Sequence, residues 1–247
     1  MEKVNPRIKK LEFLLKQMGK IHLRDAAEIL NVSEMTIRRD LNVHTGSISL
    51  LGGYIVKDPE QDENHYSIHQ HQTKCIAEKM YIGKLAASLV KDGDVVFFDC
   101  GSTIPYIASQ IDSSIKFTAL CCSINTFMVL QENLNCELIL CGGRYSRNNS
   151  VFSALGVGSE LGLICPTKAF ISAAGVDLKK GVTCFDFDEA KIKAMVMEKS
   201  QQNILVFDHS KLHHVQRAYI GKIEHFDLLI SDRALSSSMD KLPPIMC

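Results

Sequence analysis

Apolar residues near the start of the chain recur at the three- and four-residue spacing of a helix. The apolar positions of the first predicted helix are Ile8, Leu11, Leu14, Leu15 and Met18. Gly19 ends that pattern, and a second helix is predicted from Leu23 to Leu30. A third helix is predicted after a short turn, and residues 47–56 then form two short β segments around Gly52 and Gly53. Three helices followed by a hairpin predict a winged helix-turn-helix.

The third predicted helix begins after Ser33, a good N-cap residue, and has two different faces. Ile37 and Leu41 lie one turn apart and are predicted to pack on a core, so Met35 and Arg39 point away from it. Taken alone, this pattern equally fits an ordinary solvated helix. Within a winged helix-turn-helix it predicts a DNA recognition helix, because hydroxyl, thioether and guanidinium groups can contact base edges and phosphates. The residues predicted to contact DNA are Ser33, Glu34, Met35, Thr36, Arg38 and Arg39.

Beyond residue 57 the pattern of apolar and polar residues changes. A polar segment with a Pro and no apolar periodicity predicts a linker at residues 58–72. A helix is predicted from about residue 73 to 90, and short apolar runs then alternate with helical patterns. The predicted strands are residues 95–98, 117–122, 138–141, 169–173, 204–207 and 228–230. This alternation predicts a parallel sheet covered on both faces, and so a Rossmann-like α/β domain at residues 73–247 after a winged helix-turn-helix domain at residues 1–57.

The size and composition of the chain fit a folded, two-domain protein. It has 247 residues, of which 46% are hydrophobic and 23% charged. Apolar runs fall short of the roughly 18–20 residues that span a bilayer, and the N-terminus lacks the apolar core of a signal peptide. We therefore expect a cytoplasmic protein without a membrane partner.

The net charge of zero hides an asymmetry between the two predicted domains. Residues 1–57 contain ten Lys/Arg and six Asp/Glu, a net charge of +4, so the remainder has a net charge of −4. Only the N-terminal segment is suited to a polyanion. Because the excess is modest, we expect sequence-specific DNA binding by an oligomer.

The nine cysteines are an odd number, are scattered, and include no C-x-x-C spacing. Several lie in apolar runs, where Cys behaves as a small hydrophobic residue. We expect reduced, buried thiols rather than disulfides. The His residues also lack ligand spacing, so no metal site and no cofactor are predicted.

The residues that follow each predicted strand are small or polar. In an open α/β sheet, ligands bind beyond the carboxyl ends of the strands. Gly101 is expected to let the backbone approach a ligand, while Ser102 and Thr103 begin a helix whose free amides suit a phosphate. Each segment taken alone also fits a plain turn or cap, but together with the cation of Lys211 they predict a site for a small sugar phosphate. The predicted ligand-binding residues are Asp99, Gly101, Ser102, Thr103, Ser123, Asn125, Gly142, Gly143 and Lys211.

These same segments resemble the DeoR family of bacterial repressors. The segment from Ser33 to Leu41 is similar to the DNA-binding signature of that family. The segments similar to its sensor-domain motifs are residues 99–103, Ser123 with Asn125, 141–143, 173–176 and 208–211. The resemblance extends from about residue 7 to residue 233. It implies a cytoplasmic homo-oligomer that binds double-stranded operator DNA and is released by a phosphorylated sugar.

A closer likeness to one member of the family rests on further segments. These segments are residues 50–56, 97–101, 172–176, 180–185 and 208–211. Leu51 and Tyr54 depart from the wing residues of many relatives, so wing contacts cannot be transferred from the wider family. The closer likeness implies deoxyribose 5-phosphate as inducer and genes of deoxyribose and deoxynucleoside catabolism as targets.

The sensor motifs also resemble ribose-5-phosphate isomerases, which need an acid and a base beside the sugar carbonyl. The corresponding segment, residues 172–177, lacks the central carboxylates of those enzymes. Glu189 and Lys191 are interpreted as part of an exposed helix, and no catalytic residue is predicted. Three alternatives stay open: a regulator that answers to another sugar phosphate, an activator, or a residual isomerase with an accessory DNA-binding domain.

Overall fold

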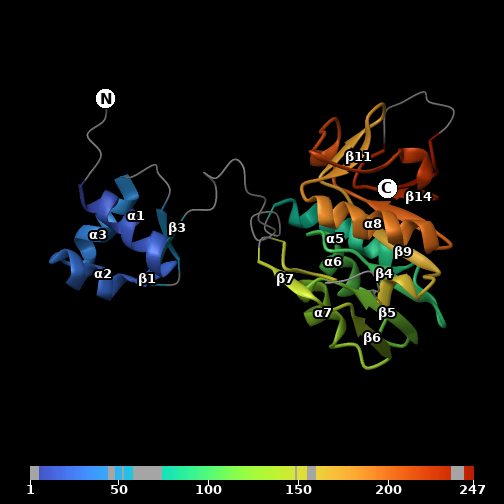
Figure 1. Cartoon of the computed structure of the whole chain (residues 1–247), viewed down its shortest axis with the longest axis horizontal. Helices are drawn as coiled ribbons and strands as arrows, with labels where there is room; N and C mark the ends of the chain where they lie inside the picture. The colour runs from blue at the N-terminus through green and yellow to red at the C-terminus, as the bar shows by residue number, and fades with distance from the viewer. Residues whose placement is uncertain are drawn as a thin grey trace. The chain divides into compact units, whose positions relative to one another are not determined.

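The chain divides into two compact units, residues 1–65 and residues 66–247 (Figure 1). The computed structural model describes residues 6–43, 48–51, 53–57, 74–147, 149–154, 160–234 and 242–247. The linker predicted at residues 58–72 lies outside the described residues. We refer to the two parts as the N-terminal unit and the C-terminal unit.

The N-terminal unit is a winged helix-turn-helix, as predicted. Its helices are α1 (Pro6–Met18), α2 (Leu23–Leu30) and α3 (Glu34–Val43). The wing strands are β2 (Ile48–Leu51) and β3 (Tyr54–Lys57), and β3 also pairs antiparallel with the short strand β1 (Lys20–His22). Strand β1 was not predicted, because three residues are too few to show a periodicity. Buried residues from all three helices and from the sheet form one apolar core.

The turn between α2 and α3 fixes the direction of the third helix. Asn31 ends α2 in the left-handed conformation, with φ of 52°, and its amide donates to carbonyl oxygens of the last turn. Ser33 Oγ then accepts a hydrogen bond from the amide of Thr36 at 3.2 Å, which confirms the predicted N-cap. Ile37 and Leu41 are buried, 1% and 8% exposed, on the inner face of α3.

The C-terminal unit is built on a seven-stranded parallel sheet with the order β15-β14-β12-β9-β4-β5-β6. Its strands are β4 (Val95–Phe98), β5 (Phe117–Cys121), β6 (Cys136–Leu140), β9 (Lys168–Ser172), β12 (Asn203–Val206), β14 (Leu228–Ile230) and β15 (Ile245–Met246). Each of the six predicted strands is present, with ends shifted by at most two residues. The α/β fold class is therefore confirmed.

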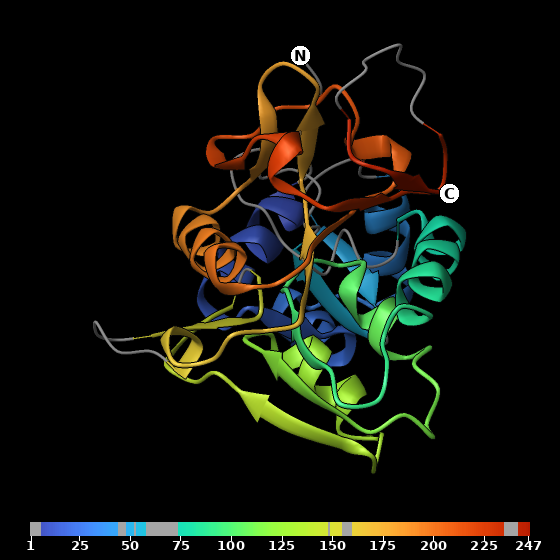
Figure 2. The same ribbon diagram turned by 90° about the vertical axis from the view of Figure 1, so that its right-hand side faces the viewer.

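Helices cover both faces of this sheet (Figure 2). One face packs on α5 (Ile76–Ala87), α6 (Ile104–Ala108) and α7 (Ile124–Leu130), and the other packs on α8 (Phe187–Lys199). Side chains alternate between the two cores along each strand, so Phe97 joins the α8 side while its neighbours Val96 and Phe98 join the α5 side. Strands buried on both faces explain the continuous apolar runs in the sequence.

Smaller elements lie outside the main sheet. An antiparallel sheet has the order β10-β11-β13, and β7 and β8 form a hairpin. The bounds of these strands are β7 (Arg144–Ser146), β8 (Val151–Ser153), β10 (Gly175–Asp177), β11 (Gly181–Cys184) and β13 (Ala218–Gly221). Single 3-10 turns occur at η2 (Glu160–Gly162), η3 (His209–Lys211) and η4 (Ile223–His225). These strands and turns were not predicted.

Five of the nine cysteines are buried, in agreement with their apolar sequence context. Burial raises the pKa of Cys121 to about 12, so this thiol stays protonated at neutral pH. All nine carry free thiols. None of the helices within the described ranges has the length and apolarity to cross a membrane.

Candidate functional site

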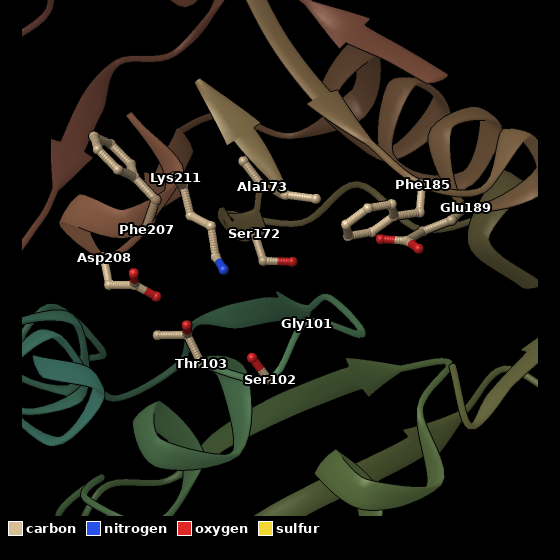
Figure 3. Close-up of a pocket in the computed structure, with 11 residues that line it drawn as sticks. Gly101, Ser102, Thr103, Ser172, Ala173, Phe185, Glu189, Phe207, Asp208 and Lys211 are labelled. Carbon is tan, nitrogen blue, oxygen red and sulfur yellow. The ribbon is translucent and has the colours of Figure 1, made fainter. Parts of the chain in front are cut away.

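A pocket lies beyond the carboxyl ends of β4, β9 and β12 (Figure 3). Ligands of open α/β sheets bind at this edge, which we call the strand-end rule. Its volume is about 430 Å³, the open mouth included. The lining residues are Gly101, Ser102, Thr103, Ser172, Ala173, Ala174, Phe185, Glu189, Phe207, Asp208 and Lys211. Four of the predicted ligand-binding residues therefore come together here: Gly101, Ser102, Thr103 and Lys211.

One end of this pocket carries the groups that suit an anion. Ser102 and Thr103 follow β4 in a tight turn, and Lys211 points toward them from η3 (Figure 3). Among the described residues, no backbone carbonyl accepts from the amides of Ser102 and Thr103. Helix α6 has five residues, so these amides and hydroxyls matter more than a helix dipole. We call Ser102, Thr103 and Lys211 the anion end of the pocket.

Two further groups shape the charge near the anion end. The Asp208 carboxylate is buried and accepts a hydrogen bond from the amide of Ser210 at 3.0 Å. Lys79 of α5 is also buried, and burial lowers its pKa to about 8, although the charge of Asp208 opposes this shift. The first turn of α5 therefore contributes a second amino group to this region.

Gly101 is required by the packing of the protein itself. A Cβ atom at this position would lie 2.1 Å from Ser172 Oγ, well inside van der Waals contact. The expectation that this glycine also gives a ligand access to the backbone stays a prediction, and Gly101 does line the pocket. Gly101 lets the end of β4 pass directly against the end of β9.

A buried polar cluster forms the floor of the pocket. Lys193 of α8 contacts both Asp99 and Glu189, with its Nζ 2.8 Å from Glu189 Oε1, and also donates to the Ser172 carbonyl oxygen at 2.9 Å. Asp99 Oδ2 accepts from the amide of Ser172 at 2.8 Å. The side chains of Asp99 and Lys193 are each 1% exposed. Asp99 thus lies beneath the pocket and holds β4, β9 and α8 together.

The charges of this cluster stabilise one another. Burial alone would lower the pKa of Lys193, but the neighbouring carboxylates of Asp99 and Glu189 raise it well above its ordinary value. Burial alone would raise the pKa of Asp99, but Lys193 and the hydrogen bonds from Ser172 lower it. The other oxygen of Asp99, Oδ1, has no hydrogen-bond partner among the described residues.

Glu189 is the main correction to the sequence interpretation. It was expected on an exposed helix face, but it is 8% exposed and lines the pocket. Its neighbour Lys191 is exposed and pairs with Asp188, as expected. A Glu and a Lys four residues apart are typical of a solvated helix, so the sequence did not reveal that Glu189 pairs inward with Lys193.

Apart from Asp99, which follows β4, the remaining predicted ligand-binding residues follow β5 and β6. Ser123 is fully buried, and a β-bridge joins it to Val151 of the β7–β8 hairpin. Gly143 has φ of 137°, and a Cβ there would lie 2.1 Å from the Ser153 carbonyl oxygen. The residues that do not line the pocket are Asp99, Ser123, Asn125, Gly142 and Gly143. Their contact with a ligand stays a prediction.

Within the described part of the chain, two groups of side chains have donor atoms close enough to suggest a metal. Asp99, Cys100 and Glu189 form one, but the Lys193 ammonium already contacts both carboxylates of that group. The other consists of Glu78, His209 and Asp232, where His209 Nδ1 lies 2.6 Å from Asp232 Oδ2 in a direct hydrogen bond.

The second candidate site is the outer face of α3 in the N-terminal unit. Met35 is 73% exposed, and Arg38 and Arg39 are exposed beside it. Ser33 and Glu34 are also exposed, and Thr36 is half-buried. Met35 and Arg39 thus lie on the side of α3 opposite Ile37 and Leu41, with Thr36 and Arg38 on its flanks and Ser33 and Glu34 at its N-terminal end.

Several pocket residues were absent from the predicted site. Ser172, Ala173, Ala174, Phe207 and Asp208 directly follow or end sheet strands, so the strand-end rule could have found them. Phe185 and Glu189 come from the end of β11 and the first turn of α8, which lie outside the main sheet. The carboxyl ends of the main-sheet strands therefore do not point to these two residues.

An exposed recognition helix in one unit and a pocket with an anion end in the other define a class of protein. The class is that of DNA-binding transcriptional regulators with a separate sensor domain. Residues 7–60 match the DeoR-like helix-turn-helix domain, and residues 74–233 match the DeoR C terminal sensor domain. The chain belongs to the DeoR family.

The chain is similar to several known proteins. The chain is 45% identical to the deoxyribose operon repressor of Escherichia coli (strain K12), over 88% of this chain and 86% of that protein. It is 31% identical to the HTH-type transcriptional repressor GlcR of Bacillus subtilis (strain 168), over 90% and 86% of the two chains. Among solved structures, ribose 5-phosphate isomerase A from Methanocaldococcus jannaschii is similar with a TM-score of 0.41 and 18% identity, over 54% of this chain and 53% of that one.

Proposed function

We propose that this protein is a cytoplasmic transcriptional repressor that a sugar phosphate, deoxyribose 5-phosphate, releases from its operator. Its targets are genes of deoxyribose and deoxynucleoside catabolism. The 45% identity to the Escherichia coli deoxyribose operon repressor supports the inducer and the targets. The observation that supports a sugar phosphate as the ligand is the anion end of the pocket, where Lys211 faces Ser102 and Thr103.

In this proposal the N-terminal unit binds operator DNA through α3, with Arg38 and Arg39 available to phosphates and base edges. The sugar phosphate binds the C-terminal unit with its phosphate at the anion end. Release requires that the ligand-bound protein binds DNA less tightly, so operator DNA must weaken sugar phosphate binding by the same factor. The repressor acts as a homo-oligomer, because a charge excess of +4 on residues 1–57 is modest for a single DNA contact.

Titration of deoxyribose 5-phosphate with and without operator DNA tests this proposal. We expect its affinity to fall in the presence of operator, and operator affinity to fall by the same factor when the sugar phosphate is present. Thr103→Ala should weaken deoxyribose 5-phosphate binding about 10- to 100-fold, because it removes a hydroxyl from an anion, and should leave operator affinity intact. Equal affinities with and without operator would rule out the coupling.

A residual isomerase is the second candidate, and the burial of Glu189 in the pocket favours testing it. A sensitive assay of ribose 5-phosphate turnover by the purified full-length protein separates the two. We expect no turnover above that of a Glu189→Gln variant. A screen of phosphorylated sugars by thermal shift distinguishes deoxyribose 5-phosphate from inducers of other DeoR-type regulators.

A further inference from the structure

The two ends of the pocket are lined by different groups (Figure 3), and the carboxylate of Asp208 at the anion end lies beside the cation of Lys211. Lys211 points toward Ser102 and Thr103 at the anion end. On the other side of Ser172, the pocket is lined by the ring of Phe185 and the carboxylate of Glu189. A ligand whose phosphate lies at the anion end would therefore extend toward a carboxylate.

The Glu189 carboxylate is held in that position. Lys193, one turn further along α8, is 2.8 Å from Glu189 Oε1 and is itself fixed by Asp99 and by the Ser172 carbonyl oxygen. Glu189 cannot swing into solvent without leaving this buried ammonium. Since the one ammonium contacts two carboxylates, the cluster keeps an excess of negative charge, and Glu189 is its member at the pocket wall.

The fixed carboxylate of Glu189 favours ligands with some chemical groups near it and disfavours others. A carboxylate accepts hydrogen bonds and donates none, so it is complementary to a hydroxyl group. It repels a second phosphate or a carboxylate on the ligand, and this repulsion is strong because Glu189 is only 8% exposed to solvent. The backbone around it is also fixed, because Arg217 Nε donates to the Phe185 carbonyl oxygen at 2.6 Å and Asp186 caps α8.

We propose that Glu189 contacts the sugar end of the ligand and restricts the pocket to sugar monophosphates whose far end bears hydroxyl groups and no charge. This inference rests on the proposed function, since it assumes that the pocket binds a sugar phosphate at all. It goes further by assigning the specificity to a residue outside the predicted site. Asp99 and Lys193 act as positioning residues for Glu189.

Isothermal titration of the full-length protein with three probes tests the assignment. The probes are 2-deoxyribose 5-phosphate, ribose 1,5-bisphosphate and inorganic phosphate. Glu189→Gln keeps the shape of the side chain and an acceptor for Lys193 but removes the charge. We expect this variant to bind the monophosphate about tenfold more weakly and the bisphosphate at least about tenfold more tightly than the wild type, with inorganic phosphate changed less than about twofold.

Asp188→Asn is the matched control, because it removes the same charge from the adjacent position of α8, where the side chain is 53% exposed and paired with Lys191. We expect all three affinities to stay within about twofold of the wild type. If Glu189→Gln does not fold, Glu189→Asp serves instead. It keeps the charge, so it should still exclude the bisphosphate while losing affinity for the monophosphate.

The outcomes separate this inference from the proposed function. If the wild type binds the monophosphate and Glu189→Gln leaves the ratio of monophosphate to bisphosphate affinity unchanged, the role of Glu189 is refuted while the proposed function stands. If the folded wild type binds neither sugar phosphate, the proposed function fails and the assignment of Glu189 fails with it.

Discussion

Lys193 in the C-terminal unit and Arg39 in the N-terminal unit are both cations on helices, but their surroundings are opposite. Lys193 is 1% exposed and lies between two carboxylates. Arg39 is exposed on the outer face of α3. A buried cation is committed to its internal partners and stabilises the structure, whereas an exposed cation is available to a partner molecule. The two units thus use positive charge for different purposes.

Replacing Lys193 should give the largest effect. Lys193→Met leaves Asp99 and Glu189 buried without their cation, which costs about 3–5 kcal/mol of unfolding free energy in the C-terminal unit. Urea unfolding followed by circular dichroism measures this loss. Lys191→Met on the same helix is the control, since Lys191 is 78% exposed and should change stability by less than about 0.5 kcal/mol. Equal losses for the two variants would contradict the comparison.

The same cluster predicts a pH dependence. The pKa of Asp99 is lowered on folding, so its contribution to stability is present above its unfolded pKa of about 3.9 and is lost as the pH falls through the folded value. The pKa of Lys193 is raised, so its contribution is present below about pH 10.4 and is lost as the pH rises through the folded value. The difference in unfolding free energy between the wild type and Lys193→Met should therefore shrink in acid below about pH 4. A constant difference from pH 7 to strong acid would show that the ion pair does not cause it.

Replacing Arg39 should affect binding and leave stability alone. Arg39→Ala removes a group that can contact base edges, so the ratio of operator to random DNA affinity should fall about 10- to 100-fold. Fluorescence anisotropy with both DNAs at one salt concentration measures this ratio. An equal weakening on both DNAs would instead identify Arg39 as a phosphate contact. The unfolding transition serves as the control and should not move.

The smallest effect is expected at an ion pair of intermediate exposure. Arg7 of α1 contacts Asp40 of α3 through two hydrogen bonds of 2.6 and 3.0 Å, and the Arg7 side chain is 41% exposed. Solvent and salt screen this pair, so Arg7→Met should lower the thermal midpoint of the N-terminal unit far less than Lys193→Met lowers that of the C-terminal unit. The loss should shrink further at high salt. A loss as large as that at Lys193 would mean that exposure does not decide the strength of these pairs.

The main sheet could be predicted because its signal is local. Each of its six predicted strands is an apolar run buried on both faces, and such a run is visible without knowledge of its partners. The β10-β11-β13 sheet could not be predicted in this way. Its strands have three or four residues, and β11 pairs with β13 across more than thirty residues of intervening chain. Pairing at that distance leaves no pattern in a single short segment.

The residues of the candidate site also fall into those that the sequence could predict and those that it could not. Ser102, Thr103 and Lys211 follow strands of the main sheet, so the topology brought them to one edge, as predicted. Phe185 and Glu189 depend on where the small sheet and α8 pack, which the sequence does not show. The inward direction of Glu189 in turn depends on Lys193, and a lysine gives no sign in the sequence that it will be buried.

The strand order also has a consequence for how the chain folds during synthesis. Every strand pairing in the N-terminal unit lies within residues 20–57, so this unit can fold as soon as that segment emerges. In the C-terminal unit, β4 pairs with β9, which puts Val96 opposite Lys168, and β14 pairs with the final strand β15. The seven-stranded sheet is therefore complete only when Ile245 and Met246 have been synthesised. Each new chain completes its DNA-binding part first and its sensor last.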